Sequence, residues 1–297
     1  MTIKYLVLSG GGSTGLVTYG VLKNLHNKSM WDLKNLKAVY GTSIGAVVGV
    51  MIILDYEWDF LDKYIIERPW NKLIDIEPEN FINLNLKKGL LDTKIISEIL
   101  LPLLEAKGFS KNITLKEFFE KTNIEFHAIT CNLNSIDIQA VENISYKTRP
   151  NMLLLKAIEA SSCIPFLFSP VCEETNCYID GGLFVNYPLN ICLEETKCEL
   201  DEVLGIKNKW EPHNKIIDNN MGIAEFICLF IKKVHAYTEQ TRNQTDIPNC
   251  VVCWINSSCV DIGEYSSFIY DKNVRKKLIK KGEKYAEDFL KGATAPF

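Results

Sequence analysis

Long hydrophobic runs are absent from this sequence. Its longest apolar stretches, Ala46–Leu54 and Ile223–Ile231, have about half of the ~20 residues that a transmembrane helix needs. Low-complexity tracts, repeats of fixed period and linkers rich in proline, glycine and serine are missing too. With 297 residues, 47% of them hydrophobic, the chain can bury a full core. We therefore predict one domain over residues 1–297, in which the polar stretch Lys207–Asn220 is a long loop or a weak boundary.

An excess of charge of one sign is also absent. The chain has 33 lysines and arginines against 37 aspartates and glutamates, a formal net charge of −4. Proteins that bind nucleic acids draw much of their affinity from basic side chains that neutralise phosphates. We therefore expect no nucleic-acid partner.

Metal-binding cysteine patterns are scarce, although the chain has ten cysteines. The C-x-x-C motif from Cys250 to Cys253 lies in an apolar, strand-like run without a second pair, so we interpret it as part of a buried strand. The N-terminal residues form a short strand that leads directly into glycines, which does not resemble a signal peptide. We expect reduced thiols, a cytoplasmic protein and no metal or other cofactor.

The chain begins with an alternation of strands and helices. The pattern predicts a strand over Ile3–Leu8, a glycine loop over Gly10–Gly15, a helix over Leu16–His26, a strand over Leu36–Tyr40 and a helix over Ala46–Leu54. Such a β-α-β-α order is typical of an α/β fold with a mostly parallel central sheet flanked by helices. Further predicted helices are Thr93–Ala106, Thr114–Lys121, Asn151–Ala160, Gly222–Thr238 and Asn273–Leu290, and further predicted strands are Ile124–Thr130, Ile136–Val141, Cys177–Ile179, Asp201–Ile206 and Cys250–Ile255.

A serine stands between two glycines at the end of the second predicted strand. The segment Gly41-Thr42-Ser43-Ile44-Gly45 has the G-x-S-x-G form of a nucleophile elbow. In such an elbow a tight strand-to-helix turn exposes the serine hydroxyl, and small neighbours relieve crowding. Ser43 is therefore a candidate nucleophile.

The glycine loop Gly10-Gly11-Gly12-Ser13-Thr14-Gly15 has two interpretations. It fits the G-x-G-x-x-G pattern of dinucleotide-binding folds, but these need an acidic residue at the end of the second strand, and the nearest one, Asp32, precedes that strand. The alternative is that the backbone N–H groups of the loop hold the oxyanion of a transition state. Because the first two strands are expected to be parallel neighbours, the loop and Ser43 would meet at the same edge of the sheet.

A serine nucleophile needs a base, and histidines are few. The four candidates are His26, His127, His213 and His235, and each is more easily explained as a structural residue. An α/β-hydrolase order of Ser, Asp and His would leave His213 or His235 eligible. That fold, however, places several strands before its elbow, and here only one strand precedes the strand of the elbow.

Asp180 is the alternative base. It follows the predicted strand Cys177–Ile179 and precedes Gly181 and Gly182, so a sharp turn can present its carboxylate at the edge where Ser43 lies. A carboxylate with an ordinary pKa near 4 is a weak base, but partial burial raises its pKa. Without chemistry, Asp180 would simply belong to an Asp-Gly turn.

Together these motifs resemble the patatin-like phospholipases from Leu8 to about Pro188. The family pattern is a glycine-rich oxyanion loop, a G-x-S-x-G elbow and a D-G-G or D-G-A turn with the aspartate of a Ser-Asp dyad. Smaller matches are Gly15-Leu16 through Gly20-Val21-Leu22, Gly89-Leu90-Leu91-Asp92, Ala160-Ser161-Ser162-Cys163-Ile164-Pro165 and Asp180-Gly181-Gly182-Leu183-Phe184-Val185-Asn186-Tyr187-Pro188.

The resemblance implies a three-layer α/β fold and hydrolysis of acyl lipids through an acyl-enzyme, as in phospholipase A or lysophospholipase. Ser43 would be the nucleophile, Asp180 the general base, and the amides of Gly10, Gly11 and Gly12 the oxyanion hole. The expected partner is a phospholipid or another acyl lipid. Peripheral membrane contact is left open, and the oligomeric state is not specified.

Thr14 departs from the family pattern, whose loop usually carries arginine or lysine at this position. The missing cation would weaken the stabilisation of an anion or change the preferred head group. Thr14 favours the alternative of a catalytically silent lipid-binding protein, which the intact Ser43 and Asp180 oppose. An acyltransferase, in which an alcohol replaces water, is a second alternative that the sequence does not separate from the hydrolase. A dinucleotide-binding protein is the weaker alternative.

Two further sets of residues have both a functional and a structural interpretation. The segment Lys272–Lys291 combines an apolar stripe with many lysines, so it either lies on an anionic membrane or, as is more common, docks on the core. Aromatic residues near the elbow and near the Ala160–Pro165 segment either line an acyl channel or pack in the core. These aromatic residues are Tyr56, Trp58, Phe60, Trp70, Phe166 and Phe168.

Overall fold

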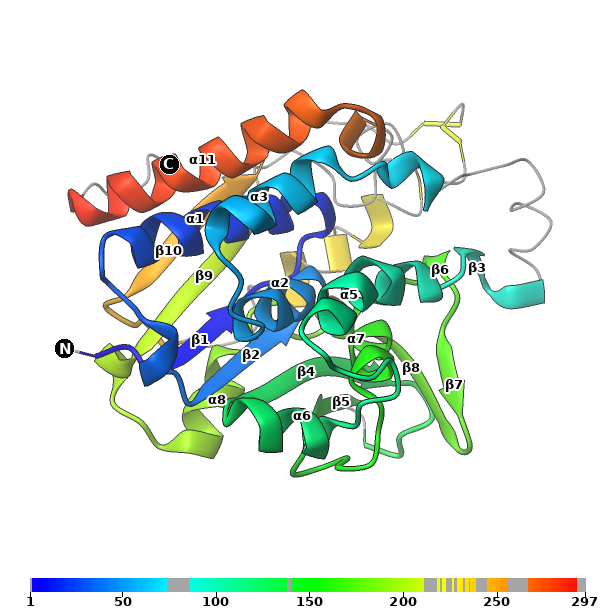
Figure 1. The fold of residues 1–297 in the computed structure, drawn as a ribbon. Helices are drawn as coiled ribbons and strands as arrows, with labels where there is room; N and C mark the ends of the chain where they lie inside the picture. The colour runs from blue at the N-terminus through cyan, green and yellow to red at the C-terminus, as the bar shows by residue number, and fades with distance from the viewer. Residues whose placement is uncertain are drawn as a thin grey trace.

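A mostly parallel sheet of eight strands forms the middle layer of the molecule in the computed structural model, and helices cover both of its faces (Figure 1). The structure describes residues 2–73, 86–137, 140–210, 245–255 and 267–292, together with scattered positions between 218 and 238. The predicted α/β, three-layer fold class is confirmed.

The parallel strands form one side of the sheet. Their order is β10 (Cys250–Ile255), β9 (Val203–Trp210), β1 (Tyr5–Leu8), β2 (Ala38–Thr42) and β4 (Glu125–Asn132). Antiparallel strands β8 (Asn176–Asp180) and β7 (Val171–Glu173) follow β4, which also pairs with β5 (Val141–Ile144). A small second sheet joins β3 (Gly89–Leu91) to β6 (Phe166–Phe168).

The helices differ in which face of the sheet they cover. The described helices are α1 (Gly15–Asn27), α2 (Ile44–Ile53), α3 (Trp58–Glu67), α5 (Lys94–Ala106), α6 (Leu115–Thr122), α7 (Leu154–Ser162), α8 (Leu189–Thr196) and α11 (Lys272–Leu290). In β1, Leu6 and Leu8 belong to the larger core cluster, which includes residues of α1 and α2. Tyr5 and Val7 point the other way, into a smaller cluster with residues of α8. This alternation is the ordinary consequence of a strand buried on both faces.

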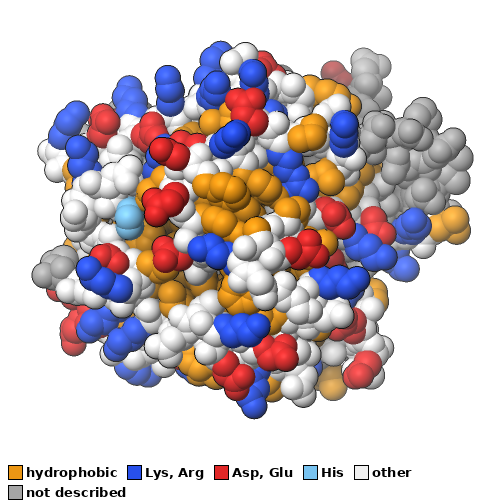
Figure 2. Space-filling view, viewed as in Figure 1, with side chains coloured by type: hydrophobic (Ala, Val, Ile, Leu, Met, Phe, Trp, Pro, Cys, Tyr) orange, Lys and Arg blue, Asp and Glu red, His pale blue; other side chains and the backbone are white. Residues whose placement is uncertain are grey.

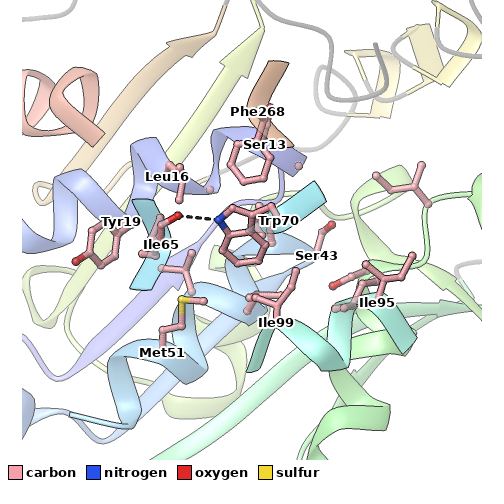
Figure 3. Close-up of a pocket in the computed structure, with 18 of the residues that line it drawn as sticks. Ser13, Leu16, Tyr19, Ser43, Met51, Ile65, Trp70, Ile95, Ile99 and Phe268 are labelled. Atoms are coloured by element: carbon pink, nitrogen blue, oxygen red, sulfur yellow. Dashed lines mark hydrogen bonds between the residues drawn. The ribbon is translucent and has the colours of Figure 1, made fainter. Parts of the chain in front are cut away.

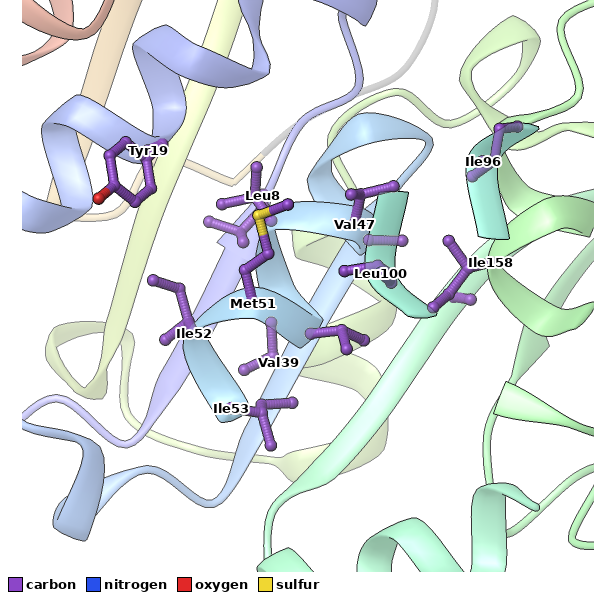
Figure 4. Packing of buried hydrophobic residues seen from close by; sticks show 14 of the residues in the cluster. Leu8, Tyr19, Val39, Val47, Met51, Ile52, Ile53, Ile96, Leu100 and Ile158 are labelled. Atoms are coloured by element: carbon purple, nitrogen blue, oxygen red, sulfur yellow. The ribbon is translucent and has the colours of Figure 1, made fainter. Parts of the chain in front are cut away.

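Helix α2 is buried on all sides, because it lies between the sheet and the helices α5 and α7. Every residue from Gly45 to Ile53 is buried, so the helix has no polar face. Figure 4 shows Leu8 and Val39 of the sheet packed against Val47, Met51 and Ile52 of this helix. The residue that directly precedes such a rigid, fully packed helix therefore has a well-defined position.

Helix α11 docks on α1, as the more common interpretation of the Lys272–Lys291 segment predicted. The backbones approach so closely that a Cβ on Gly282 would lie 2.1 Å from the Val17 carbonyl oxygen. Ile279 and Ala286 are buried in the same contact. The lysines of α11 remain at the surface, and Figure 2 shows them along the edge of the molecule that this helix forms.

The structure corrects some of the expected elements. The strand predicted over Ile136–Val141 is wrong: β5 begins only at Val141, and a turn in which Ser135 N–H donates to Asn132 O leaves Ile136 fully exposed. β9 continues to Trp210, so the first residues of the stretch Lys207–Asn220 are strand and not loop. The predicted helix Gly222–Thr238 lies largely outside the described residues, and helices α3 and α8 were not predicted.

The cysteines among the described residues are free, including the half-buried Cys250 and the buried Cys253 of β10. Cys250 and Cys253 form part of a strand, as predicted. Cys172 and Cys177 lie directly opposite each other in the β7–β8 hairpin, with their Sγ atoms 2.8 Å apart. The N–H and C=O groups of Cys177 bond to residues 132 and 133 on the other side, so the two cysteines form a non-hydrogen-bonded pair, in which side chains lie closest.

Candidate active site

Ser43 lies in a strained turn between β2 and α2. Its φ and ψ angles are 55° and −126°, a conformation that costs a non-glycine residue about 1–3 kcal/mol. A Cβ on Gly45 would lie 2.4 Å from the Leu8 carbonyl oxygen, and one on Gly41 would lie 2.5 Å from the Ala46 nitrogen. The G-x-S-x-G spacing is therefore a steric requirement of the turn, and the predicted elbow is present.

The end of helix α7 holds this turn in place. Ser43 N–H donates to the Ser161 hydroxyl at 3.0 Å, and that hydroxyl donates to the Ile129 carbonyl of β4 at 2.6 Å. Ser161 is completely buried. The backbone of Ser43 is thus tied to β4, on the side of β2 away from β1.

Asp180 ends strand β8 on the same side of β2. It is opposite Thr130 of β4, and its N–H donates to the Cys163 carbonyl at 3.0 Å. Its Oδ1 accepts a hydrogen bond from Gly182 N–H at 2.7 Å, while its buried Oδ2 has no hydrogen-bond partner among the described residues. The carboxyl therefore retains capacity to accept a further proton.

Burial raises the pKa of Asp180 from 3.8 to about 6. The Ser43 side chain and the Gly182 N–H act in the opposite direction, because both stabilise the charged form. A carboxylate with a pKa near 6 is a much better proton acceptor at neutral pH than an exposed one.

The glycine loop lies against Ser43 from the β1 side. A Cβ on Gly10 would lie 3.1 Å from Cβ of Ser43 and 2.5 Å from Oδ1 of Asn186. Gly10 N–H itself donates to the Asn186 carbonyl at 3.2 Å, so this N–H group is not available to hold an oxyanion. The amides that remain for an oxyanion are those of Gly11 and Gly12, and Gly12 lines the pocket beside Ser43.

Thr14 and Asn208 orient these two amides. Asn208 Nδ2 donates to the Gly10 carbonyl at 3.0 Å, and the Thr14 hydroxyl donates to the Gly11 carbonyl at 2.7 Å. In a planar trans peptide the C=O and the following N–H point in opposite directions. Fixing these carbonyls therefore turns the N–H groups of Gly11 and Gly12 the other way, and the position of the usual basic residue serves here to brace the loop.

Asn208 was missed by the sequence analysis, which placed it in the polar stretch after the strand. Continuing the strand alternation from Leu204 through Ile206 would have put Asn208 on the same buried face. Its side chain is 1% exposed, which is unusual for asparagine.

An apolar pocket of about 900 Å³, which includes the space at its open mouth, extends from Ser43. Figure 3 shows Tyr19 toward one end and Ile95 toward the other, with the Trp70 indole and Ser43 between them. Its wall combines residues from several separate elements. They are Gly12, Ser13, Gly15, Leu16, Tyr19, Ser43, Ile44, Val47, Val48, Met51, Ile65, Trp70, Ile95, Ile96, Ile99, Ser162, Ile164, Phe168 and Phe268.

A buried arginine fixes one wall of the pocket. Arg275 of α11 donates to the carbonyls of Ile66 and Phe268, at 2.8 and 2.6 Å, and its side chain is 4% exposed. Trp70 is held separately by its hydrogen bond to the Ile65 carbonyl, which Figure 3 draws as a dashed line. Helix α11 thus has a structural role at the pocket as well as on α1.

The aromatic residues divide between the two expected roles. Trp70 and Phe168 line the pocket, whereas Phe60 and Phe166 are exposed. Trp58 packs against His26 at a second, smaller depression that Tyr56 also lines.

The described histidines do not line the pocket that contains Ser43. His26 accepts a hydrogen bond from Trp58, and His127 is buried against Tyr40 and bonded to Asn143 and Glu125. His213 and His235 lie outside the described residues.

The sequence places the chain among known proteins. Residues 6–193, more than half of the chain, match the sequence profile of the family described as Patatin-like phospholipase. This chain belongs to the patatin-like phospholipase family. The predicted resemblance is confirmed, and the alternative of a dinucleotide-binding fold is not supported, since Asp32 lies before β2 and bonds to Lys34 N–H.

Two viral proteins and one solved structure are among the proteins that are similar to this chain. Uncharacterized protein R571 of Acanthamoeba polyphaga mimivirus is 30% identical over 219 residues, 74% of this chain and 69% of the relative. Probable lipid hydrolase 463L of Invertebrate iridescent virus 6 is 29% identical over 203 residues, 64% of this chain and 63% of that relative. VipD from Legionella pneumophila has a TM-score of 0.54 at 18% identity, covering 99% of this chain and 67% of VipD, which supports the fold alone. Membership of this family indicates a lipid hydrolase.

None of the described helices is both long and apolar enough to span a membrane.

Proposed function

We propose that this chain is a serine-dependent lipid acyl hydrolase in which Ser43 is the nucleophile and Asp180 the general base. The observation that carries the proposal is the state of Asp180. Its Oδ2 is buried without a partner among the described residues, its pKa is raised to about 6, and the Ser43 side chain acts against that rise. A carboxylate in this state can accept the serine proton directly, without a histidine.

The proposed reaction has two steps. In the first, Asp180 takes the proton of Ser43 as its Oγ attacks the acyl carbonyl, and the amides of Gly11 and Gly12 hold the oxyanion. Asp180 then gives the proton to the leaving alcohol. In the second step, water activated by Asp180 releases the fatty acid and restores Ser43. Gly10 acts by its small size, which lets the loop approach the serine.

The pocket supports an acyl lipid as the substrate. Its wall is almost entirely hydrocarbon and aromatic and includes Ser43, so an acyl chain inside the pocket can bring its ester to the nucleophile. We propose phospholipids or lysophospholipids as the substrate class. The exposed lysines of α11, among them Lys276, Lys277, Lys280 and Lys284, support peripheral contact with an anionic lipid surface.

The decisive experiment compares the wild type with Ser43→Ala and Asp180→Asn. Incubation with a panel of phospholipids, lysophospholipids and neutral acyl esters, followed by mass spectrometry, should give free fatty acid only with the wild type. A fluorophosphonate probe should label the wild type and not Ser43→Ala. A wild type with neither turnover nor labelling would indicate a silent binding protein, and transfer to an added alcohol in place of hydrolysis would indicate an acyltransferase. Wild-type turnover by Ser43→Ala would refute the mechanism.

Membrane contact needs its own measurement. Flotation with liposomes should recover more protein with anionic than with neutral vesicles, and rising salt should reduce the difference because the attraction is screened. Equal recovery with both vesicle types would contradict an electrostatic contact.

A further inference from the structure

Ser162 carries a buried hydroxyl without a partner in the wall of the pocket. It is the last residue of α7, it is 6% exposed, and its Oγ makes no hydrogen bond among the described residues. The rest of the wall is almost entirely apolar. Leaving a hydroxyl unpaired inside a protein costs stability, so its presence calls for an explanation.

The neighbours of Ser162 in the chain place it at the reacting end of the pocket. The Ser161 hydroxyl accepts the N–H of Ser43, and the Cys163 carbonyl accepts the N–H of Asp180. Ser162 therefore lies between residues that contact the proposed nucleophile and the proposed base. Ser162 also lines the pocket that contains Ser43.

Sheet order shows which side of the ester Ser162 faces. The glycine loop follows β1, on one side of β2, whereas β4 and Asp180 of β8 lie on the other side. Ser162 belongs to the second side, because Ser161 bonds to β4 and Cys163 bonds to β8. If the oxyanion is held at the loop, the leaving oxygen must face Asp180, which protonates it.

We propose that the Ser162 hydroxyl donates a hydrogen bond to the leaving alkoxy oxygen of the scissile ester. This inference rests on the proposed function and extends it to a preference for oxygen esters. When the carbon–oxygen bond breaks, its electron pair stays on the alkoxy oxygen, which takes the proton that Asp180 received from Ser43. Ser162 keeps its own proton and stabilises the charge that develops on that oxygen.

The test compares an acyl oxygen ester with the acyl thioester of the same chain length. Sulfur is a weak hydrogen-bond acceptor, so it gains little from Ser162. Ser162→Ala should lower kcat/KM for the oxygen ester about 5- to 10-fold, the value of one hydrogen bond, and change the thioester much less. Ser162→Cys, which replaces the hydroxyl by a slightly larger group that is a weak donor, should resemble Ser162→Ala.

Thr18 offers a matched control. Its Oγ1 is also buried without a partner among the described residues, but it does not line the pocket. Thr18→Val and Ser162→Ala should both unfold at or slightly above the wild-type temperature, because each removes an unpaired hydroxyl. Thr18→Val should leave kcat/KM unchanged for both the oxygen ester and the thioester.

The outcomes are distinct. Equal losses on both esters would overturn the inference, since the hydroxyl would then act on the carbonyl oxygen or through packing. Unchanged rates in Ser162→Ala, with an active wild type, would overturn the inference while the proposed function stands. A wild type that neither turns over acyl esters nor reacts with the fluorophosphonate probe would overturn the proposed function, and with it the role of Ser162.

Discussion

Replacing Asp180 by asparagine should make the folded chain more stable at neutral pH while it removes the activity. Burial of Asp180 raises its pKa from 3.8 to about 6. In the unfolded chain the group titrates near 3.8, so the folded state binds the proton more tightly. The stability that this proton provides is complete below pH 3.8 and is lost as the pH rises through 6.

The size of the effect follows from these two values. Each unit of difference between the pKa of 3.8 in the unfolded chain and the pKa of about 6 in the folded chain is worth about 1.4 kcal/mol. An ionised Asp180 therefore costs the folded state about 3 kcal/mol above pH 6. Asparagine has nearly the same shape and no charge, and its carbonyl can still accept from Gly182 N–H. Its N–H₂ group needs acceptors at a site where Oδ2 had none, which reduces the net gain to about 1–3 kcal/mol.

Urea unfolding at pH 4 and pH 7.5 measures this gain directly. The free energy of unfolding of Asp180→Asn, relative to the wild type, should increase by about 2 kcal/mol between the two pH values. Asp55→Asn, at an exposed position, is the control and should show no such increase. A difference that is the same at both pH values, or a variant less stable than the wild type at pH 7.5, would refute the reasoning.

Other measurements test the rest of the site. The logarithm of kcat/KM should rise with slope one up to about pH 6 and then level off, because Asp180 must be ionised to accept the proton; a flat profile from pH 4.5 to 8 would contradict its role as base. Asn208→Leu and Thr14→Val should each lower kcat about 10-fold with little change in KM, because each removes a hydrogen bond that orients an amide acting mainly in the transition state. Steady-state kinetics measures this effect. A variant that unfolds more easily but keeps the wild-type kcat would show that the residue is purely structural. Oxidised glutathione should join Cys172 and Cys177 by a disulfide, detected by peptide mass mapping and absent in Cys172→Ser; glutathione adducts that persist without the bridge would contradict the hairpin geometry.

The sequence by itself determined the local parts of the site. The elbow around Ser43 can be predicted because the turn between β2 and α2 requires small residues at fixed positions. A few consecutive residues are therefore enough to identify the turn. The same holds for the glycine loop and for the β-α-β-α order at the start of the chain. The strand predicted over Ile136–Val141 failed for the complementary reason, since an alternating pattern cannot tell a strand from an exposed turn that side-chain hydrogen bonds stabilise.

Only the tertiary structure decided how these parts act together. Pairing of β8 with β4 brings Asp180 to Ser43, and burial there, which no local pattern reports, raises its pKa. Asn208 reaches the glycine loop from β9, and the hydroxyl of Ser162, at the end of α7, has no partner among the described residues. The desolvation and hydrogen bonding of a side chain depend on which distant segments pack around it. The order of the strands in the sheet determines this packing, and the residues that are adjacent in the sequence do not.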